Sequence, residues 1–246
     1  MKKALVTGGT RGLGLAIAHK LIKAGYAVTV TGTSKDGKGP KGSQYLACDF
    51  ATPAAVADLA AQVKSLGLSV LINNAGINKI GLMEDYSSAD FLRIQQVNVA
   101  APWLLCRAAV PGMRKRRYGR IVNVASDAAR GGSSGEAVYS ACKGGLVALS
   151  KTLAREHARQ SITVNVVCPG PTDTQLFAEA INPKIKDTFV QIIPLKRIAQ
   201  PEEIAAGVAF FHKQSAGFRT ETGVELDGEI IHEFPQATRQ TAHRNI

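Results

Sequence analysis

Cysteine is scarce and widely spaced in this chain of 246 residues. The four cysteines, Cys48, Cys106, Cys142 and Cys168, include no pair at the spacing of roughly two to four residues that is typical of a zinc site or a redox dithiol. We therefore expect no metal site and interpret the four cysteines as small buried hydrophobic residues.

Long hydrophobic runs are also missing. No apolar stretch approaches the roughly 18 residues of a membrane-spanning helix, and the first residues, Met1-Lys2-Lys3, lead into only a short uncharged stretch before Gly8. With 45% hydrophobic and 20% charged residues, the composition also excludes a disordered or collagen-like chain. We expect a cytoplasmic globular protein with no membrane association.

Acidic residues are fewer than basic ones. The chain has 19 Asp and Glu against 30 Lys and Arg, a net charge of +11, which fits nucleic acid, an acidic carrier protein or a phosphorylated cofactor as partner. The one dense basic run, residues 114–117, is accompanied by no aromatic ladder or helix-turn-helix pattern, so it is better interpreted as a solvated helix end. We expect no nucleic-acid partner.

Seven short runs, most of them almost continuously apolar, predict parallel strands that are covered on both faces. They lie at residues 4–7, 28–31, 45–48, 70–72, 121–124, 164–167 and 224–226. Helical patterns separate the runs; one of them places Leu13, Ile17 and Leu21 on one helix face that ends near Gly25. We predict an α/β fold, a doubly wound, Rossmann-like parallel sheet that binds its ligand at the carboxyl ends of the strands. The glycine-rich segment 34–42 is too short to divide the chain into two domains.

A glycine-rich turn follows the first predicted strand directly. Residues 7–14 read Thr-Gly-Gly-Thr-Arg-Gly-Leu-Gly, and glycines at such a place let the backbone approach a pyrophosphate on the N-terminus of the next helix. The strand before the turn and the helix after it favour a dinucleotide site over an ordinary glycine-rich turn that binds no ligand. The spacing of Gly8, Gly12 and Gly14 resembles the motif of the short-chain dehydrogenase/reductase family.

Other motifs of that family follow in order. They are Asn-Asn-Ala-Gly at 73–76, Asn98, Ser126, Tyr-Ser-Ala-Cys-Lys at 139–143, Pro-Gly at 169–170 and Pro-Glu-Glu-Ile-Ala at 201–205. The resemblance predicts one family domain over residues 1–228 and an atypical C-terminal tail over 229–246, where two histidines, His232 and His243, lack the spacing of metal ligands. We expect the tail to be mobile or to reach a neighbouring subunit.

The resemblance implies hydride transfer between a nicotinamide and a carbonyl or secondary-alcohol carbon, with Asn98, Ser126, Tyr139 and Lys143 as catalytic residues. Tyr139 and Lys143, four residues apart, share one helix face, so the ammonium should lower the pKa of the phenol and make it a usable acid and base. Ser126 would hydrogen-bond the substrate oxygen, and Asn98 would anchor a water chain to Lys143. Taken singly, Tyr139 is an ordinary packed aromatic and Ser126 an ordinary helix cap, but these readings do not explain the joint spacing.

The resemblance also implies the cofactor site. The residues expected to bind the cofactor are Gly8, Thr10, Arg11, Gly12, Leu13, Gly14, Thr33, Ser34, Asp49, Phe50, Asn74, Ala75, Gly76, Tyr139, Lys143, Pro169, Gly170, Thr172 and Thr174. No acid follows the second strand until Asp36, while Arg11 stands where NADP-linked relatives carry a basic residue, so we expect NADP(H) to be preferred, with NAD(H) as the alternative. A surface arginine is the alternative reading of Arg11, and a helix N-cap that of Asp49.

Two parts of the chain resemble enzymes that act on different substrates. The first strand–helix units resemble NADP-linked 3-oxoacyl carrier-protein reductases, whereas residues 119–174 resemble NAD-linked 2-hydroxycyclohexanecarboxyl-CoA dehydrogenases. We expect a small carbonyl, alcohol or acyl-thioester substrate. Carrier-protein reductases often have two basic residues beside the active-site entrance, and Arg117 matches one of them. The second position is Gln160 in this chain, with Arg159 beside it. Only one of the two positions therefore supports an acyl carrier protein as a partner.

Two further expectations concern assembly and function class. The family resemblance implies a homotetramer built on the helices around residues 98–116 and 138–157, although their apolar faces could equally belong to the core. A non-catalytic regulatory protein that keeps the fold and a bound dinucleotide is the alternative to an enzyme.

Overall fold

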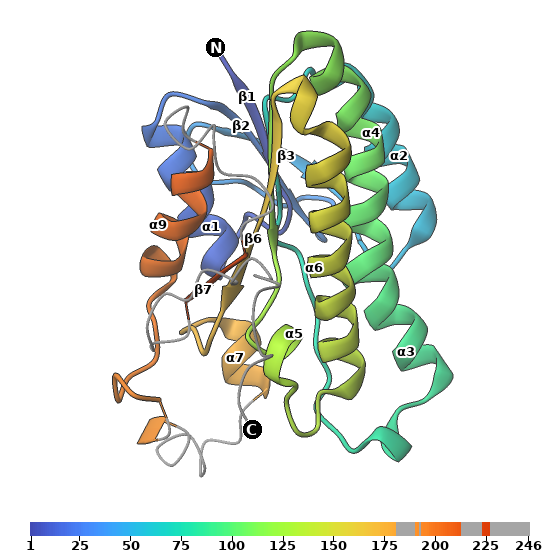
Figure 1. Ribbon diagram of the computed structural model, residues 1–246, viewed down its shortest axis with the longest axis vertical. Helices are drawn as coiled ribbons and strands as arrows, with labels where there is room; N and C mark the ends of the chain where they lie inside the picture. Colours follow the sequence, from blue (N-terminus) through green and yellow to red (C-terminus); the bar gives the residue numbers. More distant parts are fainter. Residues whose placement is uncertain (181–189, 192, 213–222, 227–246) are drawn as a thin grey trace, which may run out of the picture.

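Seven parallel strands form one sheet in the order β3-β2-β1-β4-β5-β6-β7, as Figure 1 shows for a computed structural model that describes residues 1–180, 190–191, 193–212 and 223–226. The strands are β1 (Lys3–Val6), β2 (Ala27–Gly32), β3 (Ser43–Ala47), β4 (Val70–Asn73), β5 (Gly119–Val124), β6 (Ile162–Pro169) and β7 (Gly223–Leu226). The helices are α1 (Gly12–Lys23), α2 (Pro53–Leu66), α3 (Ser88–Gln95), α4 (Ala101–Arg116), α5 (Ala128–Gly131), α6 (Ala137–His157), α7 (Gln175–Ala180) and α9 (Pro201–Phe211). The predicted fold class is confirmed, and every predicted strand is present.

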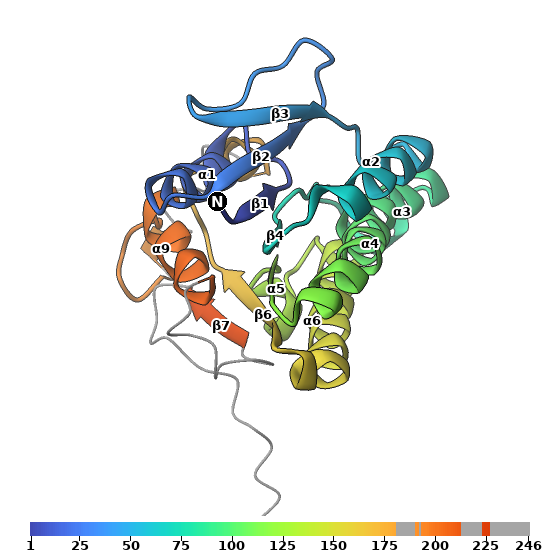
Figure 2. The same ribbon diagram turned by 90° about the horizontal axis from the view of Figure 1, so that it is seen from above.

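Helices cover both faces of the sheet. Figures 1 and 2 show α1 and α9 on one face and α2, α4 and α6 on the other. Side chains alternate along the strands, so that Leu5 and Ile121 pack toward α2 and α4, while Val6 and Val122 pack toward α1 and α9. Burial on both faces explains the continuously apolar strand sequences. Each fully buried Leu or Ile contributes about 1.5–3 kcal/mol to folding.

Helix α1 ends as the sequence predicts. Its last residue is Lys23, and the N–H of Gly25, which has a φ of 82°, donates to the carbonyl oxygen of Ile22. The four cysteines are also buried and free, as expected.

The connection between β2 and β3 departs from the expected alternation of strands and helices. Residues 33–42 join two adjacent parallel strands without any helix, and Figure 2 shows this loop projecting at the β3 edge of the sheet. The physical reason lies in its composition, because Gly37, Gly39, Pro40 and Gly42 all disfavour a helix. The expectation that helices separate all strands is therefore wrong at this point. The predicted tail at 229–246 lies outside the described residues.

The turn between β1 and α1 is packed too tightly to admit a side chain at Gly14. A Cβ at this position would lie 2.1 Å from the carbonyl oxygen of Gly8. We predict that Gly14→Ala lowers the free energy of unfolding by about 1–3 kcal/mol, because the backbone must shift to relieve the overlap. Denaturant unfolding checks this through a lower midpoint.

Gly145 is the matched control, since it also lies in a helix, α6, but an added Cβ would meet nothing within 4 Å. Gly145→Ala should leave the stability unchanged or raise it by up to ~1 kcal/mol through helix propensity. Equal effects of the two substitutions would show that the turn tolerates a side chain.

Candidate active site

A long cleft of about 1510 Å³ opens at the carboxyl ends of the strands. It lies where the strand order reverses between β1 and β4, which is where doubly wound sheets bind ligands. Every residue predicted to bind a cofactor lines it, and so does Ser126. Of the predicted site residues only Asn98 does not; it lies behind the wall of the cleft.

The glycine turn forms the middle of the cleft. Gly8 and Gly12 have φ values of 63° and 51°, a conformation that glycine adopts without strain. Thr7 Oγ1 accepts hydrogen bonds from the backbone N–H groups of Asn74 and Ala75, both at 2.9 Å, and thereby fastens this turn to the end of β4. Helix α1 begins at the turn, and its N-cap residue, Arg11, makes no side-chain capping bond. Its N-terminal N–H groups therefore fit the pyrophosphate of a dinucleotide.

Basic residues lie near the β2 end of the cleft. Arg11 Nη1 donates to Gln175 Oε1 at 2.6 Å, so this guanidinium bridges the glycine turn to α7. Lys38, from the loop without a helix, also lines the cleft, together with Thr33 and Ser34. Lys35 is not among the lining residues, and neither is Asp36. Sequence reasoning did not find Lys38, because its approach depends on the path of the loop.

Asp49 holds a turn in addition to lining the cleft. Its carboxylate accepts hydrogen bonds from the N–H of Ala51 at 3.0 Å and from the hydroxyl of Thr52 at 3.3 Å. The N-cap of α2 is Thr52, so Asp49 does not itself cap that helix. The interpretation of Asp49 as a helix N-cap is therefore wrong, and its predicted contact with a cofactor stays a prediction for a residue that lines the cleft.

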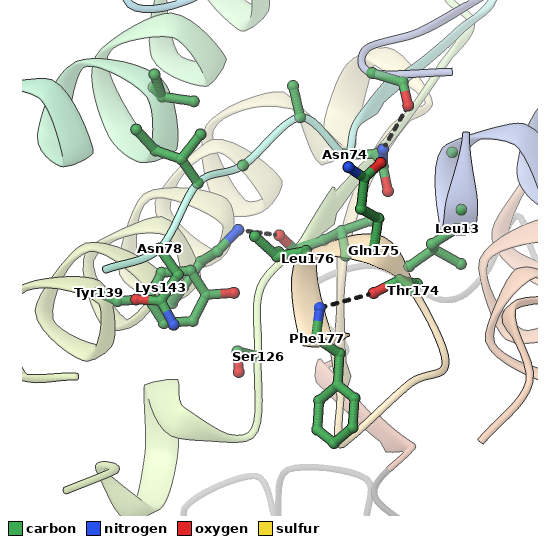
Figure 3. Close-up of a pocket in the computed structure, with 18 of the residues that line it drawn as sticks. Leu13, Asn74, Asn78, Ser126, Tyr139, Lys143, Thr174, Gln175, Leu176 and Phe177 are labelled. Atoms are coloured by element: carbon green, nitrogen blue, oxygen red, sulfur yellow. Dashed lines mark hydrogen bonds between the residues drawn. The ribbon is translucent and has the colours of Figure 1, made fainter. Parts of the chain in front are cut away.

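Tyr139, Lys143 and Ser126 meet at the other end of the cleft, as Figure 3 shows. Tyr139 and Lys143 share one face of α6, with Lys143 Nζ 5.5 Å from the centre of the Tyr139 ring. Lys143 is only 3% exposed and donates to the carbonyl oxygen of Val124 at 2.9 Å. Ser126 follows β5, and its hydroxyl donates to Asp127 Oδ1 at 2.8 Å. The three side chains that the sequence singled out are therefore brought together.

Burial is the main cause of the pKa shifts of Tyr139 and Lys143. It raises the pKa of Tyr139 well above its ordinary value, the carboxylate of Glu136 raises it further, and the hydroxyl of Ser126 acts in the opposite direction. Burial also lowers the pKa of Lys143 to about 8. The expectation that the pKa of Tyr139 is lowered is therefore wrong for the protein alone, because burial of the phenol raises that pKa. Tyr139 is a protonated phenol at neutral pH.

Asn98 lies in a π-helical turn, Gln96–Ala100, between α3 and α4. Its Nδ2 donates to the carbonyl oxygens of Ile77, at 2.8 Å, and Ile94, at 3.0 Å, whereas its Oδ1 is buried with no hydrogen-bond partner among the described residues. A Cβ on Gly76 would lie 2.9 Å from that Oδ1 and 3.4 Å from Lys143 Nζ, so the two polar atoms flank this glycine. A single π-helical turn is common at functional sites and carries no simple sequence signal.

Glu136 and Asn78 are cleft residues that sequence reasoning missed. Asn78 Nδ2 donates a short hydrogen bond to Glu136 Oε1, and both residues line the cleft near Tyr139. The signal was present, since Glu136 precedes Tyr139 by three residues and a helix brings such positions to one face.

The basic residues expected beside the entrance lie elsewhere. Arg117 is the C-cap residue of α4, shortly before β5, and its Nη2 donates to the carbonyl oxygen of Arg159 at 3.0 Å. Both residues therefore lie at the amino ends of the strands, across the length of the sheet from the cleft. The expectation that Arg117 and Arg159 border the active-site entrance of their own chain is wrong. The sequence match identified their positions in the chain, but it did not show at which end of the strands they lie.

The segment beyond β6 contributes to the cleft through α7. Leu176, Phe177 and Glu179 line it, and Figure 3 shows Leu176 and Phe177 beside Thr174. We expect residues 175–193 to cover the substrate, but residues 181–189 and 192 lie outside the described residues, as do His232 and His243. In the described part of the chain, no helix combines the length and apolarity needed to cross a membrane.

Comparison with known proteins agrees with this geometry. The family model described as enoyl-(acyl carrier protein) reductase matches residues 8–228. The 3-oxoacyl-[acyl-carrier-protein] reductase FabG of Haemophilus influenzae is 36% identical over 93% of this chain and 98% of its own. Among solved structures, a short chain dehydrogenase/reductase family protein is 36% identical with a TM-score of 0.83, covering 92% of this chain and 96% of the other.

A second solved structure is the 3-oxoacyl (acyl-carrier-protein) reductase of Agrobacterium tumefaciens C58 with NADP bound. It has a TM-score of 0.85 and 27% identity, covering 92% of this chain and 93% of the other. Matches of this length, at this identity, show common descent as well as a common fold. The chain therefore belongs to the short-chain dehydrogenase/reductase family.

Proposed function

We propose that the chain is an NADP(H)-dependent ketoreductase, which transfers a hydride between nicotinamide and a carbonyl or secondary-alcohol carbon, with 3-oxoacyl thioesters as its substrate class. The observation that carries the proposal is the meeting of Tyr139, Lys143 and Ser126 at one end of a cleft whose middle is an uncapped helix N-terminus. The relatives named as 3-oxoacyl carrier-protein reductases support the substrate class. A cytoplasmic location and a single domain over residues 1–228 are part of the same proposal.

The cleft fits a dinucleotide along its whole length. The N-terminus of α1 would hold the pyrophosphate, Asp49 and Phe50 would lie beside the adenine, and the backbone from Asn74 to Gly76 would border the nicotinamide half. When bound, the reduced nicotinamide supplies a hydride to the carbonyl carbon. The remaining steps belong to side chains of this chain.

In the reduction, Tyr139 gives its phenolic proton to the carbonyl oxygen, so that the C=O group becomes an alcohol. Its raised pKa keeps that proton in place until the oxygen gains negative charge. Ser126 turns its hydroxyl from Asp127 to the same oxygen and stabilises the developing charge. Lys143, with a pKa of about 8, then restores the proton to Tyr139, and the free Oδ1 of Asn98 holds a water that supplies Lys143.

A non-catalytic dinucleotide-binding protein is the second candidate. Such a protein has no need for a proton donor, an oxyanion donor and a buried amine at one end of the cleft, so their joint presence favours the enzyme. The deciding experiment is a screen of ketones and 3-oxoacyl thioesters with NADPH and NADH side by side. Oxidation of neither cofactor by any compound would favour the binding protein.

Replacing Tyr139 by Phe tests the proton donor. We expect turnover to fall by at least ~100-fold, because the ring remains but the transferable proton is lost. NADPH affinity, measured by the fluorescence of the bound cofactor, should survive. Tyr118→Phe removes a phenol at the amino ends of the strands, just before β5 and away from the cleft, and should leave turnover unchanged. Near-normal turnover of Tyr139→Phe would remove Tyr139 from the mechanism.

The preference for NADPH over NADH is expected to depend on Arg11 and Lys38. A charge-assisted contact to a 2′-phosphate is worth about 1.5–3 kcal/mol, so Arg11→Ala and Lys38→Ala should each lose at least ~10-fold in NADPH affinity with little change for NADH. For Arg11 this requires release of its bond to Gln175. Lys35→Ala, outside the cleft, is the matched control. Equal wild-type affinities for the two cofactors would contradict the preference.

We also propose a homotetramer that pairs α4 and α6 with their counterparts. Trp103 on α4 and Leu92 on α3 are 46% and 61% exposed, and both line a surface groove with Val99, which places apolar side chains on the face that this pairing would cover. Light scattering at micromolar concentration should give the mass of four 26.0 kDa chains, and Trp103→Glu should reduce it. A wild-type mass of one chain would contradict this assembly.

A further inference from the structure

The guanidinium of Arg11, in the glycine turn, is held by a glutamine from a distant part of the chain. Its Nη1 donates to Oε1 of Gln175, the first residue of α7, at 2.6 Å. The start of α7 also packs against the same turn, since a Cβ on Gly12 would lie 3.4 Å from Thr174 Cγ2, and Figure 3 shows Thr174 beside Leu13. Two neighbouring residues, Thr174 and Gln175, therefore connect α7 to the turn that is expected to bind the pyrophosphate.

The amide of Gln175 is oriented by a second residue of α7. Its Nε2 donates to Oε1 of Glu179, one helical turn later, at 2.6 Å. An amide has a donating and an accepting end, so an NH2 group that faces Glu179 leaves the carbonyl oxygen to face Arg11. Glu179 thus holds Gln175 in the orientation in which it accepts from the guanidinium.

The bond to Gln175 directs Arg11 away from the place where a 2′-phosphate is expected. Thr33, Ser34 and Lys38, the cleft residues expected around that phosphate, follow β2. Gln175 follows β6, and β2 and β6 lie on opposite sides of β1 in the sheet. A guanidinium that turns toward the phosphate therefore leaves the amide.

The exchange of the amide for a phosphate distinguishes the two cofactors. In the described part of the chain, the bond to Gln175 is the one hydrogen bond of the Arg11 side chain. NADP(H) replaces this neutral acceptor by an anionic phosphate, whose charge-assisted hydrogen bonds are about twice as strong. NAD(H) has a neutral hydroxyl at that place, which offers the guanidinium no stronger acceptor than the amide. The loss of the bond to Gln175 is therefore a cost of binding NADP(H) alone.

We propose that Gln175 is a positioning residue for cofactor selection, which acts through Arg11 and limits the preference for NADP(H) over NAD(H). It holds the guanidinium on the α7 side of the glycine turn until a 2′-phosphate replaces it as the acceptor. The inference rests on the proposed function, since it requires NADP(H) to bind in the cleft with its 2′-phosphate near Arg11.

Four proteins test this inference: the wild type, Gln175→Ala, Arg11→Ala and the variant with both substitutions. The dissociation constants of NADPH and NADH are measured by the fluorescence of the bound cofactor. We expect Gln175→Ala to bind NADPH about 3- to 10-fold more tightly, because a hydrogen bond from a charged donor no longer has to be broken, with NADH within about twofold of the wild type. In the Arg11→Ala background the same substitution should have no effect on either cofactor, because the residue through which it acts is missing.

Gln62→Ala is the matched control, since Gln62 is an exposed glutamine on α2 that does not line the cleft. It should change neither dissociation constant. A Gln175→Ala variant that binds NADPH no more tightly than the wild type, or that shifts both cofactors equally, overturns this inference alone, and so does a gain that persists without Arg11. A wild type that binds neither cofactor overturns the proposed function and the inference with it.

Discussion

The burial of one amine, Lys143, is the constraint on which the rest of the active-site end depends. Charged groups are costly to remove from water, and this side chain is only 3% exposed. It is accommodated because the chain turns at the end of β5 and presents the carbonyl oxygen of Val124, 2.9 Å from Nζ. Gly76 contributes by having no side chain, since a Cβ there would lie 3.4 Å from the amine. The end of β5, the loop after β4 and α6 are thus arranged around a single nitrogen.

The same burial sets the proton chemistry. Burial makes the amine of Lys143 lose its proton more readily and the phenol of Tyr139 hold its proton more tightly. The pKa of Lys143 therefore falls and that of Tyr139 rises. At neutral pH the phenol of Tyr139 is therefore protonated, while the amine of Lys143 has a pKa close to that pH. The free Oδ1 of Asn98, across Gly76, lies in this polar pocket because a π-helical turn rotates it there. A regular helix would place the amide differently.

Much of this arrangement could be predicted from the sequence, and the failures have a common cause. Strand runs, the glycine turn and the pair Tyr139 and Lys143 are local patterns, and a parallel sheet brings the ends of its strands together by geometry. What could not be predicted depends on packing between distant segments. The glycine-rich loop after β2 brings Lys38 to the cleft, the direction of β5 removes Arg117 from it, and burial reverses the expected shift of Tyr139.

The two ends of the cleft hold different chemical groups, and the difference has a consequence for ligand orientation. Arg11 and Lys38 lie near the β2 end, while Tyr139, Ser126 and the buried amine of Lys143 lie at the other. A ligand with a phosphate at one end and a reacting carbon at the other fits this division with its phosphate toward Arg11 and Lys38, because guanidinium and ammonium groups form charge-assisted hydrogen bonds with phosphate. The glycine turn between the two ends presents the N-terminus of α1 to a pyrophosphate, so the same orientation places the reacting end of the ligand beside Tyr139.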